Sequence, residues 1–253
     1  MSTSVLYSVD GGIARIVLNR PEKRNALNPG IIADLKLHLT ASAADPDVRV
    51  VILAGAGKDF CSGADLAALE RISEAGVLDN MADASEMADL FLAMRRHPRP
   101  IVAAVQGRAL AGGCGLATAC DIVLASESAT FGYPEVNIGF IPAMVMAILR
   151  RAIPEKAAFE LIVMGETLTA ARMAELGVVH RVFPDSAFED GVSGYSKTLA
   201  SKSPSAVSLS KRLLYHMDGM GFEAALEAGV QANAIARMTE DCRAGISRFL
   251  KKT

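Results

Sequence analysis

Residues 101–119, IVAAVQGRALAGGCGLATA, decide how this chain folds. The first five are all apolar, which is typical of a strand buried on both faces of a sheet. Small residues then lead into a helix that is expected over residues 112–119. Two more apolar strands are predicted at residues 48–54 and 122–125. Because such strands alternate with helices along the chain, the sequence predicts the α/β class with a mainly parallel sheet.

The N-terminal part is expected to begin with an antiparallel hairpin. Residues 5–9 and 13–18 are rich in β-forming side chains. Asp10-Gly11-Gly12 between them suits a tight turn, because glycine adopts the positive φ that such turns need. Asn28 is followed by proline, which predicts the start of a helix over residues 29–44.

The remaining helices are concentrated toward the C-terminus. Helical periodicity is found at residues 64–75, 81–96, 186–201, 204–217 and 222–250. The C-terminal part has almost no strand signal. The sequence therefore predicts an α/β core over residues 1–190 and a helical region over residues 191–253. That region is either a cap on the same core or an oligomerisation arm.

Composition and charge exclude several classes of partner. Apolar residues make up 51% of the chain and charged residues 21%, the usual mix of a folded globular protein. The formal net charge of −2 gives no field that would attract nucleic acid. No apolar run approaches the roughly 20 residues that cross a bilayer, and the N-terminus lacks a secretory pattern. We therefore expect a cytoplasmic protein without a nucleic-acid or membrane partner.

Several common ligand sites are excluded because residues that they require are missing. The four cysteines form no C-x-x-C pair and have no histidine at zinc-ligand spacing, so we expect free thiols and no metal site. Residues 55–58 lack the flanking glycine and the Ser or Thr of a P-loop. Residues 113–118 lack the last glycine of the dinucleotide fingerprint, and no G-x-S-x-G nucleophile elbow occurs. No separate cofactor is expected.

Two strand-to-helix junctions of similar construction remain as candidates for chemistry. Residues 60–66 (FCSGADL) follow one strand, and residues 109–115 (ALAGGCG) follow another. Free N–H groups at a helix start carry partial positive charge, and small side chains let a ligand oxygen come close to them. Small residues could also serve only the close packing of helix on sheet. Side by side, the two junctions would form an oxyanion hole.

Four segments of the chain resemble the crotonase superfamily, the family of enoyl-CoA hydratases and isomerases. They are residues 19–27 (NRPEKRNAL), 62–66 (SGADL), 107–121 (GRALAGGCGLATACD) and 131–139 (FGYPEVNIG). Together with residues 168–182, the resemblance covers nearly the whole chain. It implies a crotonase-like fold, in which repeated ββα units form a spiral core that binds acyl-CoA. A helical C-terminal trimerisation region would follow this core.

The resemblance also implies roles for individual residues. The amides of Ala64 and Gly112 would hold a thioester oxygen, and Glu135 would be the acid/base. CoA, as part of the substrate, would contact both donors and also Arg24, Ala26, Ser62, Asp65 and Leu66. A homotrimer, or a hexamer made of two trimers, is implied as well.

The sequence departs from the family pattern at Gly115. Hydratases of this family generally carry two glutamates, and the first of them is replaced here by Gly115. Hydration places a proton on one carbon and hydroxide on the next, a task that two carboxylates can share, whereas a single base can shift a double bond. Side chains that could replace the missing glutamate are Asp65, Glu70, Glu86 and Tyr133.

The sequence therefore predicts an enoyl-CoA hydratase/isomerase-family enzyme that works through an enolate, with Glu135 as acid/base. Double-bond isomerisation from Δ3 to Δ2 is slightly favoured over hydration because one carboxylate suffices for it. A catalytically impaired acyl-CoA-binding or scaffold protein is the alternative, since one glutamate is missing.

Overall fold

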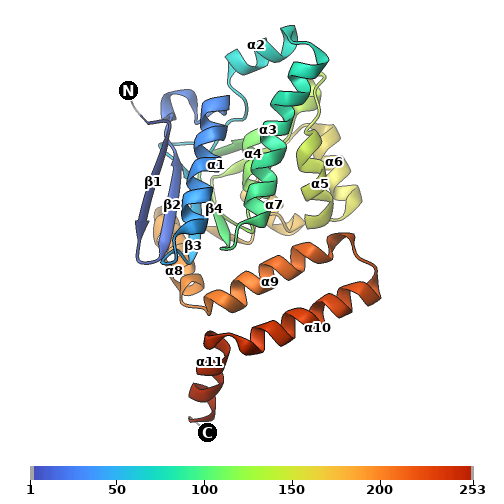
Figure 1. Ribbon diagram of the computed structural model, residues 1–253. Coiled ribbons are helices and arrows are strands. Elements are labelled where there is room, and N and C mark those ends of the chain that lie inside the picture. The colour runs from blue at the N-terminus through green and yellow to red at the C-terminus, as the bar shows by residue number, and fades with distance from the viewer. Residues whose placement is uncertain (1–2, 252–253) are drawn as a thin grey trace.

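A six-stranded sheet forms the centre of the molecule, in the order β1-β2-β3-β4-β6-β9 (Figure 1). The computed structural model describes residues 3–251. β1 pairs antiparallel with β2, and every other neighbouring pair in this sheet is parallel. The strands are β1 Val5–Asp10, β2 Ile13–Leu18, β3 Val50–Gly55, β4 Ile101–Val105, β6 Ile122–Ser126 and β9 Arg181–Phe183. The predicted hairpin and the mainly parallel α/β class are confirmed.

A second sheet was not expected from the sequence. It consists of β5 Arg108–Leu110, β7 Thr130–Gly132 and β8 Thr167–Thr169, in that order. Each strand is only three residues long, too short to show an alternating pattern. The sheet matters for the site because β5 leads into the helix that begins at Gly112, and β7 leads into the segment that carries Glu135.

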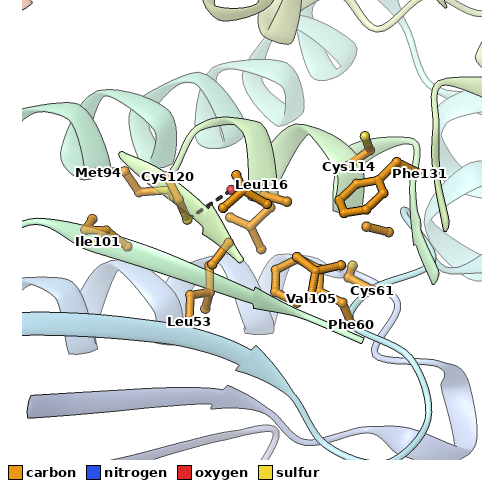
Figure 2. Packing of buried hydrophobic residues seen from close by; sticks show 14 of the residues in the cluster. Leu53, Phe60, Cys61, Met94, Ile101, Val105, Cys114, Leu116, Cys120 and Phe131 are labelled. Atoms are coloured by element: carbon orange, nitrogen blue, oxygen red, sulfur yellow. Dashed lines mark hydrogen bonds between the residues drawn. The ribbon is translucent and has the colours of Figure 1, made fainter. Parts of the chain in front are cut away.

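Helices cover both faces of the large sheet. Val51 and Leu53 of β3 belong to the main core, whereas Val50 and Ile52 point to the opposite face, because successive side chains of a strand alternate. α1 Pro29–Ala44, α3 Val77–Arg96 and α4 Gly112–Thr118 cover the first face, and α8 Phe188–Ala200 covers the second. Figure 2 shows Leu116 of α4, Met94 of α3 and Leu53 within the main core.

The other helices surround this core and extend beyond it. They are α2 Leu66–Glu74, α5 Ala143–Ala152, α6 Glu155–Met164, α7 Ala170–Leu176, α9 Pro204–His216, α10 Phe222–Met238 and α11 Glu240–Leu250, with short 3-10 segments η1 Pro21–Lys23, η2 Pro134–Ile138, η3 Asp185–Ala187 and η4 Met217–Gly219. α10 and α11 lie at the far side of α9 from the sheet (Figure 1). No helix within residues 3–251 has the length and apolarity needed to cross a membrane.

The single helix expected over residues 222–250 is wrong, because the chain leaves the helical conformation at Thr239. Thr239 has φ −69° and ψ 148°, and its side chain accepts a hydrogen bond from the N–H of Cys242. Threonine in this extended conformation is a favourable N-cap, and the following Glu240 and Asp241 suit the positive end of a new helix. A local cap thus outweighs the continuous helical periodicity.

Candidate active site

The two junctions predicted from the sequence are joined by backbone hydrogen bonds. Cys61 pairs with Ala109 in an isolated parallel bridge. The N–H of Cys61 donates to the carbonyl oxygen of Arg108 at 3.0 Å, and the N–H of Leu110 donates to that of Cys61 at 3.0 Å. These bonds bring the segment after β3 alongside the segment that enters α4.

Glycine at position 63 allows the closest approach between the junctions. A Cβ atom on Gly63 would lie 2.9 Å from the Cβ of Ala111 and 3.6 Å from the nitrogen of Gly112, and its φ of +94° also disfavours any side chain. The backbone on either side of Ala64 therefore lies against the start of α4. This is the neighbourhood that the sequence predicted for Ala64 and Gly112.

Leu27 determines the direction of the Ala64 amide. The N–H of Leu27 donates to the oxygen of Gly63 at 2.7 Å, and the N–H of Asp65 donates to the oxygen of Leu27 at 3.0 Å. The oxygen of Gly63 and the N–H of Ala64 belong to one trans peptide group and point in opposite directions, so the N–H of Ala64 points away from Leu27. Ala64 is exposed, and its N–H has no acceptor within residues 3–251. This donor is available to a ligand.

The second donor expected from the sequence is the N–H of Gly112, the first residue of α4. A residue in the first turn has no intrahelical acceptor for its N–H. Ala111 before it has φ 50° and ψ −127°, a strained conformation for a residue with a side chain. The N–H of Ala111 donates to the oxygen of Gly132 at 2.9 Å, which holds this conformation in place.

Glu135 is a buried carboxylate with an unpaired oxygen. It lies in η2 and is 9% exposed, and its Oε2 has no hydrogen-bond partner in the described part of the chain. Burial raises the pKa of Glu135 above its ordinary value. Almost all buried polar atoms in native proteins are hydrogen-bonded, so an exception calls for an explanation. A carboxylate oxygen that is left unpaired so that it can exchange a proton with a ligand is such an explanation.

A buried hydrogen-bond chain connects η2 to α4. The Thr118 hydroxyl donates to the carbonyl oxygen of Cys114 at 2.9 Å, so it accepts from the hydroxyl of Tyr133, which lies 2.8 Å away. Tyr133 is two residues before Glu135 and is fully buried. The chain therefore holds Glu135 at a defined place relative to the helix that begins with Gly112.

The thiols near these elements are not reactive groups. Cys61 and Cys114 are completely buried in the same cluster (Figure 2), and burial raises the pKa of each thiol to about 12. All four cysteines are free, as predicted. No group of three or more His, Cys, Asp or Glu side chains in the described residues could hold a metal ion.

The position of the missing glutamate has an apolar environment. A Cβ atom on Gly115 would lie 3.4 Å from Cζ of Phe91 and 3.5 Å from Cγ2 of Val145. Both neighbours are buried. The space beside Gly115 is therefore bounded by hydrocarbon, and a carboxylate placed there would lose much of its hydration.

None of the four suggested replacements is among the three closest contacts of that Cβ position. Asp65 caps α2 and pairs with Arg20 at 3.2 Å. Burial alone would raise the pKa of Asp65, but the N–H of Ala68 and the guanidinium of Arg20 together lower it. Glu86 is exposed and pairs with Lys36 at 2.5 Å, Glu70 is exposed, and the Tyr133 hydroxyl bonds to Thr118.

The residues expected along CoA form one loop region beside the Ala64 amide. The N–H of Ser62 donates to the oxygen of Arg24 at 3.1 Å, and Arg24 is exposed, with φ 52°. Ala26 is buried. Leu66 begins α2, but its side chain lies outside the described residues.

Two residues that hold this loop were missed by the sequence analysis. Arg20 donates to the oxygen of Ala26 at 3.1 Å as well as pairing with Asp65. Asn25 is fully buried with φ 55°, and its side-chain amide donates to the oxygens of Ala56 and Asp59 at 2.9 and 2.7 Å. Asparagine tolerates positive φ better than most residues. This tolerance for positive φ was the feature of the sequence that could have singled out Asn25.

Known proteins resemble this chain over almost its full length. The family model for enoyl-CoA hydratase/isomerase matches residues 8–253. A putative enoyl-CoA hydratase of Thermus thermophilus is 42% identical over 242 residues, which cover 96% of each chain. A 2,3-dehydroadipyl-CoA hydratase of Escherichia coli is 33% identical over 255 residues, covering 99% of this chain and 96% of the relative.

A solved structure has the same fold as this chain. The crystal structure of an enoyl-CoA hydratase of Mycobacterium smegmatis superimposes with a TM-score of 0.94 at 32% identity, covering 99% of this chain and 97% of the other. The predicted crotonase-like fold is thereby confirmed. Because the family model matches residues 8–253 and a relative is 42% identical over 96% of each chain, this chain belongs to the enoyl-CoA hydratase/isomerase family.

Proposed function

We propose that this protein acts on an acyl-CoA thioester through an enolate. The amides of Ala64 and Gly112 form an oxyanion hole for the thioester oxygen, and Glu135 moves a proton at the neighbouring carbon. The observation that carries this proposal is the unpaired, buried Oε2 of Glu135. A preorganised oxyanion donor typically stabilises a transition state by roughly 2.7–4 kcal/mol.

The preferred reaction under this proposal is isomerisation of a Δ3 to a Δ2 double bond. Glu135 takes a proton from C2 of a 3-enoyl thioester, and the electrons move into an enolate that the two amides hold. The same carboxyl then returns the proton to C4 while the double bond forms between C2 and C3. No second carboxylate is needed, which agrees with the apolar space beside Gly115.

Hydration of a 2-enoyl thioester is a second candidate, and the names of the relatives favour it. The Thermus thermophilus and Escherichia coli relatives are both named as hydratases. A protein that binds acyl-CoA without turnover is the third, because one acid/base position is glycine. In each case CoA follows the exposed Arg24, the loop residues Ala26 and Ser62, and the start of α2 at Asp65 and Leu66. No separate cofactor takes part.

We further propose a cytoplasmic homotrimer or a hexamer of two trimers. α10 carries large exposed apolar side chains, including Phe222, Leu226 and Val230, at 75%, 57% and 70% exposure. Apolar side chains gathered on one helix favour burial against another subunit.

Product analysis with two substrates separates the three candidates. The absorbance of the conjugated enoyl thioester rises when a 3-enoyl-CoA is isomerised and falls when a 2-enoyl-CoA is hydrated. We expect the rise with 3-enoyl-CoA to be the faster process. A faster fall with 2-enoyl-CoA would make hydration the main reaction. Binding of both thioesters without any change in absorbance would identify a non-catalytic protein.

A further inference from the structure

A row of side chains on α3 follows α4 from its start to its end. Met87, Phe91 and Arg95 are four residues apart, so they lie on one face of α3. A Cβ on Gly112 would lie 3.4 Å from Cε of Met87, and a Cβ on Gly115 would lie 3.4 Å from Cζ of Phe91. With a rise of about 1.5 Å per residue, Gly115 is about 4.5 Å along the helix from Gly112.

A cavity of about 300 Å³ lies beyond Phe91 along this row. Phe91 and Arg95 of α3 line it together with Thr118 and Ala119, which end α4. Ala119 is about 10 Å along the helix axis from Gly112. Phe91 thus contacts the Cβ position of Gly115 and also lines the cavity.

The charged groups around this cavity already have partners. Arg95 and Arg151 both pair with Asp218. Asp121 accepts hydrogen bonds from Lys211 and Tyr215. An acyl chain that enters the cavity therefore lies beside charges that are already paired, and it displaces water from them. Apolar side chains such as Ile148 and Val178 form other parts of its wall.

We infer that Phe91 limits the length of the acyl chain by separating the catalytic space beside Gly115 from this cavity. The inference rests on the proposed function, since it requires the thioester oxygen to lie at the amide of Gly112. Phe91 is only 8% exposed, so its ring is packed between the helix that carries it and the neighbouring elements. A short acyl chain ends at the ring, whereas a long chain has to displace it. Removing the ring joins the two spaces.

The test compares Phe91→Ala with the wild type on butenoyl-, decenoyl- and hexadecenoyl-CoA thioesters. We expect the ratio of kcat/KM for decenoyl to that for butenoyl thioester to rise at least about tenfold in the variant, because differences of a few methylenes in a pocket have effects of this size. Phe91→Leu, which keeps more of the packing, should shift the ratio in the same direction and decides the matter if Phe91→Ala does not fold.

Phe188→Ala is the matched control. It also removes a buried phenyl ring, but from the opposite face of the sheet, and should leave the ratio unchanged. An equal shift in this control, or an unchanged ratio in an active Phe91→Leu enzyme, would overturn the inference while leaving the proposed function intact. A wild type that converts none of the thioesters would instead refute the proposed function, and the inference with it.

Discussion

At the scale of single residues, Glu135 is where stability and function conflict. Its side chain is buried, and one of its oxygens has no hydrogen-bond partner within residues 3–251. Burial disfavours the charged form of a carboxyl and so raises its pKa. A raised pKa makes a carboxylate a stronger base, which suits removal of a proton beside a thioester.

Glu135→Gln should lower turnover by at least about 10²-fold while leaving CoA affinity nearly unchanged, because glutamine keeps the shape but cannot accept the proton. Steady-state kinetics and the Kd for CoA measure the two effects. Glu70→Gln, an exposed residue on α2, is the control and should retain activity. Normal turnover in Glu135→Gln would remove this residue from the mechanism.

The same substitution should stabilise the fold at neutral pH. The raised pKa of Glu135 means that the folded protein binds its proton more tightly than the unfolded chain does. Above the folded-state pKa, wild type therefore carries a charge that burial disfavours and that glutamine lacks, so the glutamine variant should be the more stable of the two. Below the ordinary pKa of 4.5 the difference should vanish. Denaturant unfolding of both proteins across this range measures it, and a less stable glutamine variant at neutral pH would contradict the argument.

The Gly115→Glu variant should have a higher ratio of 2-enoyl-CoA hydration rate to 3-enoyl-CoA isomerisation rate than wild type, because the substitution restores a second carboxylate. It should also lower the free energy of unfolding, since the new carboxylate would lie beside Phe91 and Val145 without a partner. Gly115→Ala is the control: its Cβ makes ordinary contacts, and alanine favours the helix by about 1 kcal/mol. If the glutamate variant folds but brings no relative gain in hydration, the one-base mechanism is wrong.

At the scale of elements, a buried lysine holds α9 against the core. Nζ of Lys211 donates to the oxygens of Met94 and Arg99, at 3.1 Å each, and to Oδ2 of Asp121 at 2.7 Å. Tyr215, four residues later on α9, donates to Oδ1 of Asp121 at 2.5 Å. One turn of the helix thus connects to the ends of α3 and β6.

Lys211→Met should destabilise the protein by about 3–5 kcal/mol, because it leaves the mostly buried Asp121 without its counter-charge. Thermal and denaturant unfolding measure the loss. Lys197→Met, at an exposed position on α8, is the control and should change stability by less than about 0.5 kcal/mol. Equal stability of the two variants would show that Lys211 does not hold α9 in place.

At the scale of the whole molecule, α10 and α11 extend beyond the core (Figure 1). Leu226 and Val230 of α10 are one turn apart and exposed. Light scattering at micromolar concentration should give a mass several times the 26.6 kDa of one chain. Leu226→Glu combined with Val230→Glu should lower that mass, whereas Ala224→Glu combined with Gln231→Glu, on the opposite side of α10, should not. A monomeric wild type would contradict the proposed assembly.

Local patterns in the sequence determined the class of fold and many of its elements, although the helices α5 and α6 were not predicted. Apolar runs predicted β4 and β6, and the Asn28 cap predicted the start of α1, because these signals depend on neighbours along the chain. The quoted segments also identified the family. They singled out Glu135 and Gly115, since a residue type at a motif position needs no coordinates to be recognised.

Only the tertiary structure decided what surrounds those residues. The strands β5, β7 and β8 exist because each finds a partner distant in sequence, and three residues alone carry no periodicity. The strained Ala111 is held by Gly132, and the hydrocarbon beside Gly115 comes from Phe91 and Val145 on two other helices. Such contacts form only when the packed core brings separate segments together, so no pattern along the chain records them.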